Sequence, residues 1–509
     1  MRFCAAGLRP AWLWGCAAGV NALIVFGIVF GARLMPAAEG DRAVFEAVGD
    51  GLRAGQRLYL DVYDNKDPLF FYAVGLQRWL GALGGWLFEA GCLALAGWCL
   101  AGLHRWLART ANPRQEGLCA VLGALLLSGG FWGAGQPQLP ASALLLLSVL
   151  LLCRRRPAGA GVCTGLMTGF KLISLPVGLA VAVVLLQPKR GLRPLLRFSG
   201  GVALAAPLLV VVLQARGELG AYGQTLTRNL LYSQGLLIQP GGVLEVLGSH
   251  GRTLFLAGTN NLLMLLALAT AGAILIGAAL EGSARRTSLG AAGLAGLVCA
   301  AAVTTVTGLW AGHLQLLYPT QCLALVLLVQ GWQPEIPWRR AVRLPCLLLV
   351  AAFLSGTLDL RPTYWPAPHL ITTRSQRRQQ PSPEESALRE AFPARVPDFA
   401  RLGSNGAGIP VGLGGSRLTC PDFHQYGFYG EERLNAILDC VGRSKVVLVS
   451  PDFRPWDGVP AWLPAEARGL EIQRCWNRFV ARAEQRLVEG FHCRREAAGA
   501  RVCMRRGQP

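Results

Sequence analysis

Acidic side chains gather in one polar stretch, residues 35–68, which lies between two long apolar runs. It holds seven of the chain's 29 Asp and Glu residues. Carboxylates this dense between membrane spans indicate a site, and a positioned carboxylate can take a proton from a hydroxyl. Lys66 stands in the same stretch, where a cation could stabilise a departing phosphate. We therefore expect chemistry in this stretch.

Further polar residues stand at the predicted outer ends of the apolar runs. They are Glu89, Gln136, Gln138, Lys171, Arg228 and His313. If the helical hairpins pack side by side, these residues and the acidic stretch would line one cavity of mixed charge at the outer membrane surface. Such a cavity suits a reaction in which a hydroxyl is deprotonated while a lipid-linked phosphate departs.

Each candidate also has a purely structural interpretation. Asp41 could cap a helix that starts at Arg42, and Asp61 and Asp64 could set a turn before the next helix. Lys66 could snorkel at the membrane interface. Of the remaining candidates, Lys171 could be an ordinary loop lysine, His313 an interfacial histidine and Glu89 a snorkelled acid.

Composition places the chain in a membrane. Of its 509 residues, 52% are hydrophobic and 15% charged, and the mean hydropathy is +0.39, which is too apolar for a soluble domain. The net charge of +20 comes largely from short basic clusters between apolar runs, as the positive-inside bias requires. Membrane topology thus explains the charge, and nucleic acid is not an expected partner.

Apolar runs and basic clusters together predict eleven spans, with the N-terminus in the cytoplasm and the C-terminus outside. The spans are about 11–34, 84–107, two within 117–153, two within 157–187, 198–213, 259–280, 289–309, 314–330 and 344–358. Residues 69–83 read as an interfacial helix. The run 157–187 is short for two crossings but has basic clusters on both sides. We therefore expect two short helices meeting near Lys171, with one long span as the alternative.

The chain divides into a transmembrane domain (1–358), a Pro- and Arg-rich linker (359–383) and a tail (384–509) that regains globular character. In the tail we expect a helix over 431–441 and strands over 445–450 and 470–480. The predicted fold class is an all-α polytopic membrane protein with a small extracytoplasmic α/β C-terminal domain. Disulfides suit such a tail, and its five cysteines leave at least one without a partner inside it. These are Cys420, Cys440, Cys475, Cys493 and Cys503.

An ordered series of motifs carries a family resemblance over roughly residues 10–330. After one span and an acidic loop, the chain reads Leu58-Tyr59-Leu60-Asp61-Val62-Tyr63-Asp64-Asn65-Lys66-Asp67-Pro68-Leu69. Then come a Gln-Pro-Gln tip at 136–138, the segment Gly165 to Lys171, and Gly312-His313 to Pro319. This order resembles bacterial membrane glycosyltransferases of the protein O-mannosyltransferase and aminoarabinose transferase type, in the C-type superfamily.

The resemblance implies an enzyme of the bacterial inner membrane that transfers a sugar, with inversion, from a polyprenyl-phosphate donor to an extracytoplasmic hydroxyl of a glycan, lipid or protein. By its place after span one, Asp41 would be the base. Many relatives carry a second acid beside it, where this chain has Arg42, so either Glu46 or Asp61 would supply the second acid or the enzyme is atypical. Lys66 matches the lysine that touches the donor phosphate.

Two further cations, Lys171 and Arg228, are candidates for the same phosphate, and Asp64, Glu89, Gln138 and His313 complete the candidate site. No cofactor is expected with certainty. A divalent cation stays open, although no His, Cys and Asp cluster has metal-ligand spacing. The alternative function is a lipid or glycan transporter. Transporters often show repeats and charges buried mid-span, and the sequence shows neither, which favours the enzyme.

Overall fold

The computed structural model describes residues 41–110, 112–128, 136–186, 191–227, 262–306, 315–331, 383–403, 418–420, 430–459, 467–495 and 499–507. The chain forms two compact units. One comprises Met1–Leu34, Ala82–Val211 and Val243–Ala367, and the other Met35–Gly81, Val212–Gly242 and Pro368–Pro509. The predicted spans 11–34 and 344–358, and all of the linker but its last residue, lie outside the described residues.

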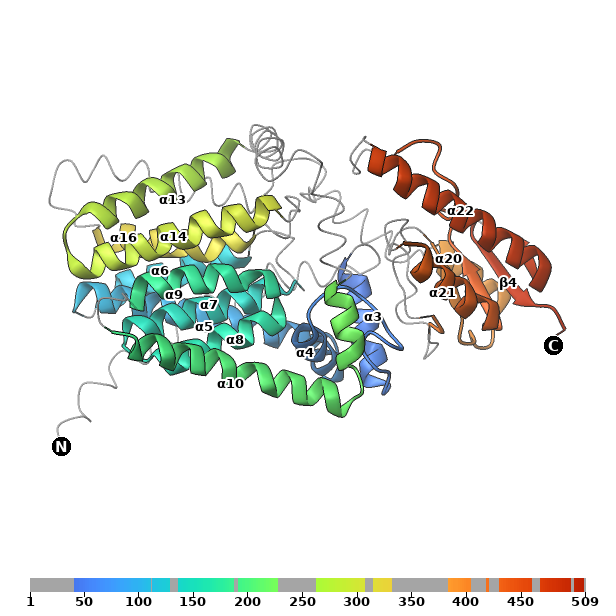
Figure 1. Ribbon diagram of the computed structural model, residues 1–509, viewed down its shortest axis with the longest axis horizontal. Coiled ribbons are helices and arrows are strands. Elements are labelled where there is room, and N and C mark those ends of the chain that lie inside the picture. The colour runs from blue at the N-terminus through green and yellow to red at the C-terminus, as the bar shows by residue number, and fades with distance from the viewer. Residues whose placement is uncertain are drawn as a thin grey trace. The chain divides into compact units, whose positions relative to one another are not determined.

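The first unit is a bundle of apolar helices (Figure 1). Its helices are α5 (Gly81–Ala108), α6 (Pro113–Ser128), α7 (Gln138–Cys153), α8 (Pro157–Phe170), α9 (Leu175–Leu186), α10 (Arg193–Ala215), α13 (Leu262–Leu280), α14 (Ala284–Val306) and α16 (Tyr318–Gly331). Every residue of α16 from Pro319 to Val329 is buried, so this helix lies in the bundle core. Among the described residues, three helices are long and apolar enough to cross a membrane: Leu87–Ala108, Arg193–Ala215 and Ala284–Thr304.

These helices confirm a helix at each expected span that the structure describes, while the total of eleven spans stays a prediction. The helical break near Lys171 is confirmed as well. α8 ends at Phe170, Lys171 is extended (φ −154°, ψ 96°), and a short 3₁₀ turn leads into α9. Pro176 explains the restart, since proline lacks a backbone donor and suits the first turn of a helix.

Glycines allow α8 and α10 to approach closely. A Cβ atom on Gly161 would lie 2.0 Å from the carbonyl oxygen of Phe198, and one on Gly201 would lie 2.1 Å from that of Ala158. Small residues at a helix contact let backbones pack against each other, which is a main source of association between membrane helices.

The second unit begins with two packed helices, α3 (Asp41–Arg53) and α4 (Pro68–Trp79). Phe45 of α3 makes an edge-on ring contact with Phe70 of α4 at 5.0 Å between centroids. α4 confirms that a separate helix precedes the next span, and it ends four residues before the predicted end of 83.

The C-terminal part of this unit is a four-stranded sheet with helices on both faces (Figure 1). In the order β1-β2-β4-β3, β1 (Ala400–Leu402) runs parallel to β2 (Val446–Val449), and β4 (Arg501–Arg505) is antiparallel to both β2 and β3 (Phe491–Arg495). Val447 and Val449 pack with α21 (Gly430–Arg443) and α22 (Ala467–Gly490). Val446 and Leu448 pack with α20 (Pro383–Ala391). Because successive side chains of a strand point to opposite faces of the sheet, β2 contributes to two small cores, one on each face.

The expected helix over 431–441 and strand over 445–450 are confirmed by α21 and β2. The expected strand over 470–480 is wrong, because these residues belong to α22. Ile472, Cys475, Trp476, Phe479 and Val480 are buried, and their spacing of three and four residues is that of one helix face. The mixed polar sequence between them obscured this period.

Two disulfides join four of the five tail cysteines, Cys420 to Cys440 and Cys493 to Cys503. The second pair joins directly opposed residues of β3 and β4. Cys475 is a buried thiol, which agrees with the expectation that one cysteine is left over.

Candidate functional site

A tight turn follows α3 and is closed by Asp61. Its carboxylate accepts hydrogen bonds from the backbone nitrogen of Arg57 (2.8 Å) and from Nε and Nη2 of the same side chain (both 3.1 Å). Hydrogen bonding by Arg57 lowers the pKa of Asp61 below its ordinary value. A carboxylate held this way is a weak base, so the geometry favours the turn-setting interpretation of Asp61.

Tyr59 occupies the centre of this turn with a backbone φ of 66°, a region that bulky residues rarely adopt. Its nitrogen donates to the carbonyl of Val62 (2.7 Å), and its phenol donates to the carbonyl of Lys66 (2.7 Å). The ring is 4% exposed. Burial, foremost, raises the pKa of Tyr59, so the phenol stays a protonated donor.

Lys66 is held by its own loop. Its ammonium donates to Oδ1 of Asn65 (2.8 Å), lies 3.9 Å from Oδ1 of Asp64 and sits 5.5 Å above the ring of Phe45. Asp64 is 5% exposed and accepts the backbone nitrogen of Lys66 (3.2 Å). The Lys66 side chain is 20% exposed, so a pre-positioned cation remains reachable by an anion.

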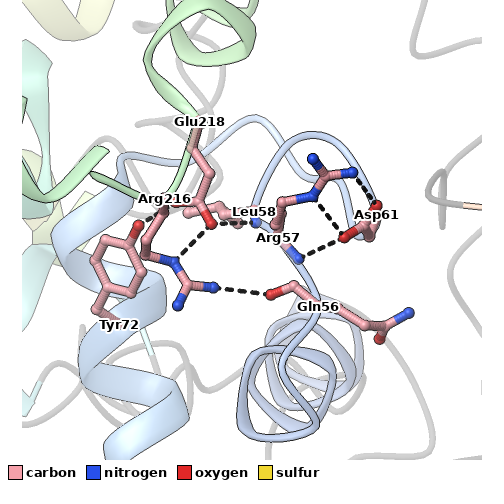
Figure 2. Close-up of polar contacts among 7 residues, drawn as sticks. All are labelled: Gln56, Arg57, Leu58, Asp61, Tyr72, Arg216 and Glu218. Carbon is pink, nitrogen blue, oxygen red and sulfur yellow. Dashed lines mark hydrogen bonds and ion pairs between the residues drawn. The ribbon is translucent and has the colours of Figure 1, made fainter. Parts of the chain in front are cut away.

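A fully buried carboxylate, Glu218, ties the turn to the segment after α10 (Figure 2). Its Oε1 accepts from the backbone nitrogen of Leu58 (2.9 Å) and from Nε of Arg216 (2.8 Å), and its Oε2 accepts from the phenol of Tyr72. Arg216 also donates to the carbonyl of Gln56 (3.0 Å). This arrangement compensates the buried charge with an ion pair and hydrogen bonds, as burial requires.

Tyr222 supplies a second tie. Its phenol donates to Oδ1 of Asp67 (2.9 Å), and its ring stacks on Tyr59 with centroids 5.4 Å apart. Residues 216–222 therefore hold the loop at its start, through Leu58, and at its end, through Asp67. The loop that carries Lys66 is fixed at both sides of the lysine.

Asp41 begins α3 as the structure describes it, one helical turn before Phe45; its side chain is not among the described ones. The neighbouring acids Glu46 and Asp50 face Arg78, which lies 3.4 Å from Glu46 and donates to both oxygens of Asp50 at 2.9 and 2.8 Å. These contacts pin α3 to α4, so Glu46 serves the packing of the two helices.

Three other candidates belong to the helical unit and are buried there: Glu89, Gln138 and Lys171 are 3%, 3% and 6% exposed. The rings of Phe88 in α5 and Phe170 in α8 lie 6.2 Å apart, so these two helices are in contact there. Glu89 and Lys171 are the residues that follow these two phenylalanines in the sequence. Arg228 and His313 lie outside the described residues.

Sequence reasoning did not single out Tyr59, Asp67, Arg216, Glu218 or Tyr222 as site residues. The contacts of Glu218 and Tyr222 span about 150 residues of sequence, so no local spacing could reveal them. Within the part of the chain that the structure describes, no three His, Cys, Asp or Glu residues come together as a metal site.

Neither the protein-family models nor the curated protein sequences match this chain. Solved structures do. ArnT from Cupriavidus metallidurans, bound to undecaprenyl phosphate, matches with a TM-score of 0.53 and 12% identity over 98% of both chains. The arabinofuranosyltransferase AftD from Mycobacteria matches with a TM-score of 0.50 and 16% identity over 99% of this chain, which spans 40% of AftD.

Over nearly its whole length the chain is similar in structure to the GT-C membrane glycosyltransferases ArnT and AftD. The resemblance expected from the ordered motifs is thereby confirmed at the level of the fold, and it extends beyond residue 330 into the tail. At identities of 12% and 16%, the similarity is one of fold, and it assigns no role to individual side chains.

Proposed function

We propose that the protein transfers a sugar, with inversion, from a polyprenyl-phosphate donor to a hydroxyl of an extracytoplasmic acceptor. The GT-C fold supports this class of reaction, and ArnT is a structure of this fold that holds undecaprenyl phosphate. The acceptor is a glycan, lipid or protein. Its hydroxyl oxygen attacks the anomeric carbon as the bond from that carbon to the phosphate oxygen breaks.

The observation that carries the proposal is the position of Lys66 beside α3. Its ammonium lies 5.5 Å above the ring of Phe45, and Asp41 precedes Phe45 by four residues on the same helix. Residues four apart on a helix are neighbours on one face. A base at position 41 and a cation at position 66 therefore belong to one small region of the second unit.

The two residues have complementary roles in this proposal. Asp41 takes the proton of the acceptor hydroxyl. Lys66 stabilises the charge that develops on the departing phosphate, and its fixed loop means that little reorganisation is needed. Asp64 orients Lys66, whereas Asp61 shapes the turn. Lys171 and Arg228 are further candidates for the phosphate, and Glu89, Gln138 and His313 for lining the site.

We further propose that the protein lies in the bacterial inner membrane with its tail outside. The two tail disulfides support this orientation, because disulfides persist in oxidising compartments. No step in this proposal requires a metal, and a divalent cation at the donor phosphate is an addition that chelation of the purified enzyme would test.

A deletion strain tests the reaction and the base together. We expect a polyprenyl-phosphate sugar to accumulate and a surface glycan, lipid or protein to lose a modification, both measured by mass spectrometry. The wild-type gene and Asp61→Asn should restore the modification, whereas Asp41→Asn, at equal membrane abundance, should not. Restoration by Asp41→Asn but not by Asp61→Asn would move the base to Asp61. No accumulated donor and no lost modification would contradict the transfer reaction itself.

A further inference from the structure

A cavity of about 720 Å³ opens in the C-terminal domain, and no residue with a role in the proposed transfer lines it. It lies between the segment that leads into β1 and the end of α21. The charged and hydroxyl side chains that line it are Arg395, Asp398, Thr419, Arg443, Ser444 and Lys445. Its size is that of a small-molecule site rather than of a single bound ion.

Three cations line this cavity: Arg395, Arg443 and Lys445, all exposed. None of the three side chains has a hydrogen-bond or ion-pair partner among the residues that the structure describes. Other arginines of the domain do pair with acids: Arg389 with Glu385, Arg478 with Glu431, Arg486 with Asp439 and Arg501 with Glu484. The cations of the cavity outnumber its single carboxylate, Asp398.

The end of α21 would by itself oppose an anion, because the last carbonyls of a helix carry partial negative charge. Here those carbonyls are occupied. Ser444 donates to Val441 (3.0 Å) and to Cys440 (3.1 Å), and Arg505 donates to Arg443 (3.3 Å). The negative end of the helix is therefore largely satisfied from within the domain.

One part of the cavity lining is fastened covalently to α21. Thr419 shares a hydrogen bond of 2.7 Å with Ser444, and the adjacent Cys420 is bonded to Cys440 of α21. The disulfide keeps residues 418–420 against the end of α21. Val396 and Pro397 add an apolar surface to the same cavity.

We infer that this cavity binds a saccharide that carries a phosphate. Guanidinium forks match phosphate oxygens in bidentate geometry, and the apolar surface of Val396 and Pro397 beside them suits the face of a sugar ring. The site is separate from the proposed transfer chemistry, so the inference stands or falls independently of the roles of Asp41 and Lys66.

Calorimetric titration of the full-length protein in detergent tests the inference with glucose 6-phosphate, inorganic phosphate and glucose as probes. We expect glucose 6-phosphate to bind most tightly, and more weakly as salt rises. The triple variant Arg395→Gln, Arg443→Gln, Lys445→Gln should weaken its binding by about tenfold, as the sum of three modest exposed ion pairs. A matched triple variant of exposed arginines outside the cavity, Arg454→Gln, Arg474→Gln, Arg494→Gln, removes the same charge and should leave binding unchanged.

Equal weakening by both triple variants, or no binding of glucose 6-phosphate, would overturn the inference. Equal affinity for inorganic phosphate and glucose 6-phosphate would overturn the saccharide part of it. The variant Cys420→Ala, Cys440→Ala provides a second measurement: we expect it to weaken glucose 6-phosphate binding while the Cys493–Cys503 bond remains. Unchanged affinity in that variant would contradict the role given to the fastened part of the lining.

Discussion

The phenol of Tyr59 donates a hydrogen bond of 2.7 Å to the carbonyl oxygen of Lys66, from a backbone whose φ is 66°. An unfavourable backbone conformation persists only where the surroundings enforce it, and such positions cluster at functional sites. Here stacking on Tyr222 and the contact with Lys66 enforce it. The hydrogen bond in turn fixes the backbone of Lys66, the residue proposed to bind the donor phosphate.

Replacing Tyr59 by Phe isolates that hydrogen bond, because the ring and its stacking remain. We expect the affinity for undecaprenyl phosphate to fall by about fivefold, which corresponds to one net hydrogen bond of about 1 kcal/mol. Binding would be measured on the purified protein in detergent. The control is Leu60→Ala, an exposed residue of the same turn, which should bind as the wild type does. Equal affinities for Tyr59→Phe and the wild type would show that the contact does not position Lys66.

Glu218→Gln tests the buried tie between the loop and residues 216–218. The amide oxygen can still accept from Leu58 and Arg216, but the uncharged side chain loses the ion pair with Arg216 and the carboxylate acceptor of the Tyr72 phenol, so we expect the free energy of unfolding to fall by about 1–3 kcal/mol. Thermal unfolding and limited proteolysis of the loop would measure this. Glu431→Gln is the control, since its ion pair with Arg478 is exposed at both ends and is worth little. The same melting temperature for both variants would contradict the account of Glu218.

Adjacent glycines of α10 test the packing of the helical unit. A Cβ on Gly201 would meet backbone at 2.1 Å, whereas one on Gly200 would meet nothing within 4 Å. We expect Gly201→Ala to lower the free energy of unfolding by about 1–3 kcal/mol through overpacking. Gly200→Ala should leave it unchanged or raise it, because alanine favours helix. Similar stability of the two variants in detergent would argue against the close approach of α8 and α10.

How far the sequence predicts this molecule depends on whether the relevant pattern is local. Basic clusters and apolar runs are local, and they predicted the helices of the bundle and the break at Lys171. The Tyr-Asp-Asn-Lys block is also local, and it pointed to the Lys66 loop. The role of Glu218 could not be predicted from the sequence, because its carboxylate contacts Leu58, which lies 160 residues away in the chain. In the tail, residues 470–480 of α22 were predicted as a strand because the polar residues between the buried positions obscured the helical period.

The central claim, that Lys66 holds the phosphate of a polyprenyl donor, is tested most directly by titrating the purified protein with undecaprenyl phosphate. Lys66→Met removes the ammonium, and Arg53→Met removes a cation of the same unit that is half exposed and only loosely paired with Asp50. We predict that Lys66→Met weakens binding by at least about tenfold, as loss of a charge-assisted hydrogen bond does, while Arg53→Met binds as the wild type does. Wild-type affinity in Lys66→Met would contradict the account.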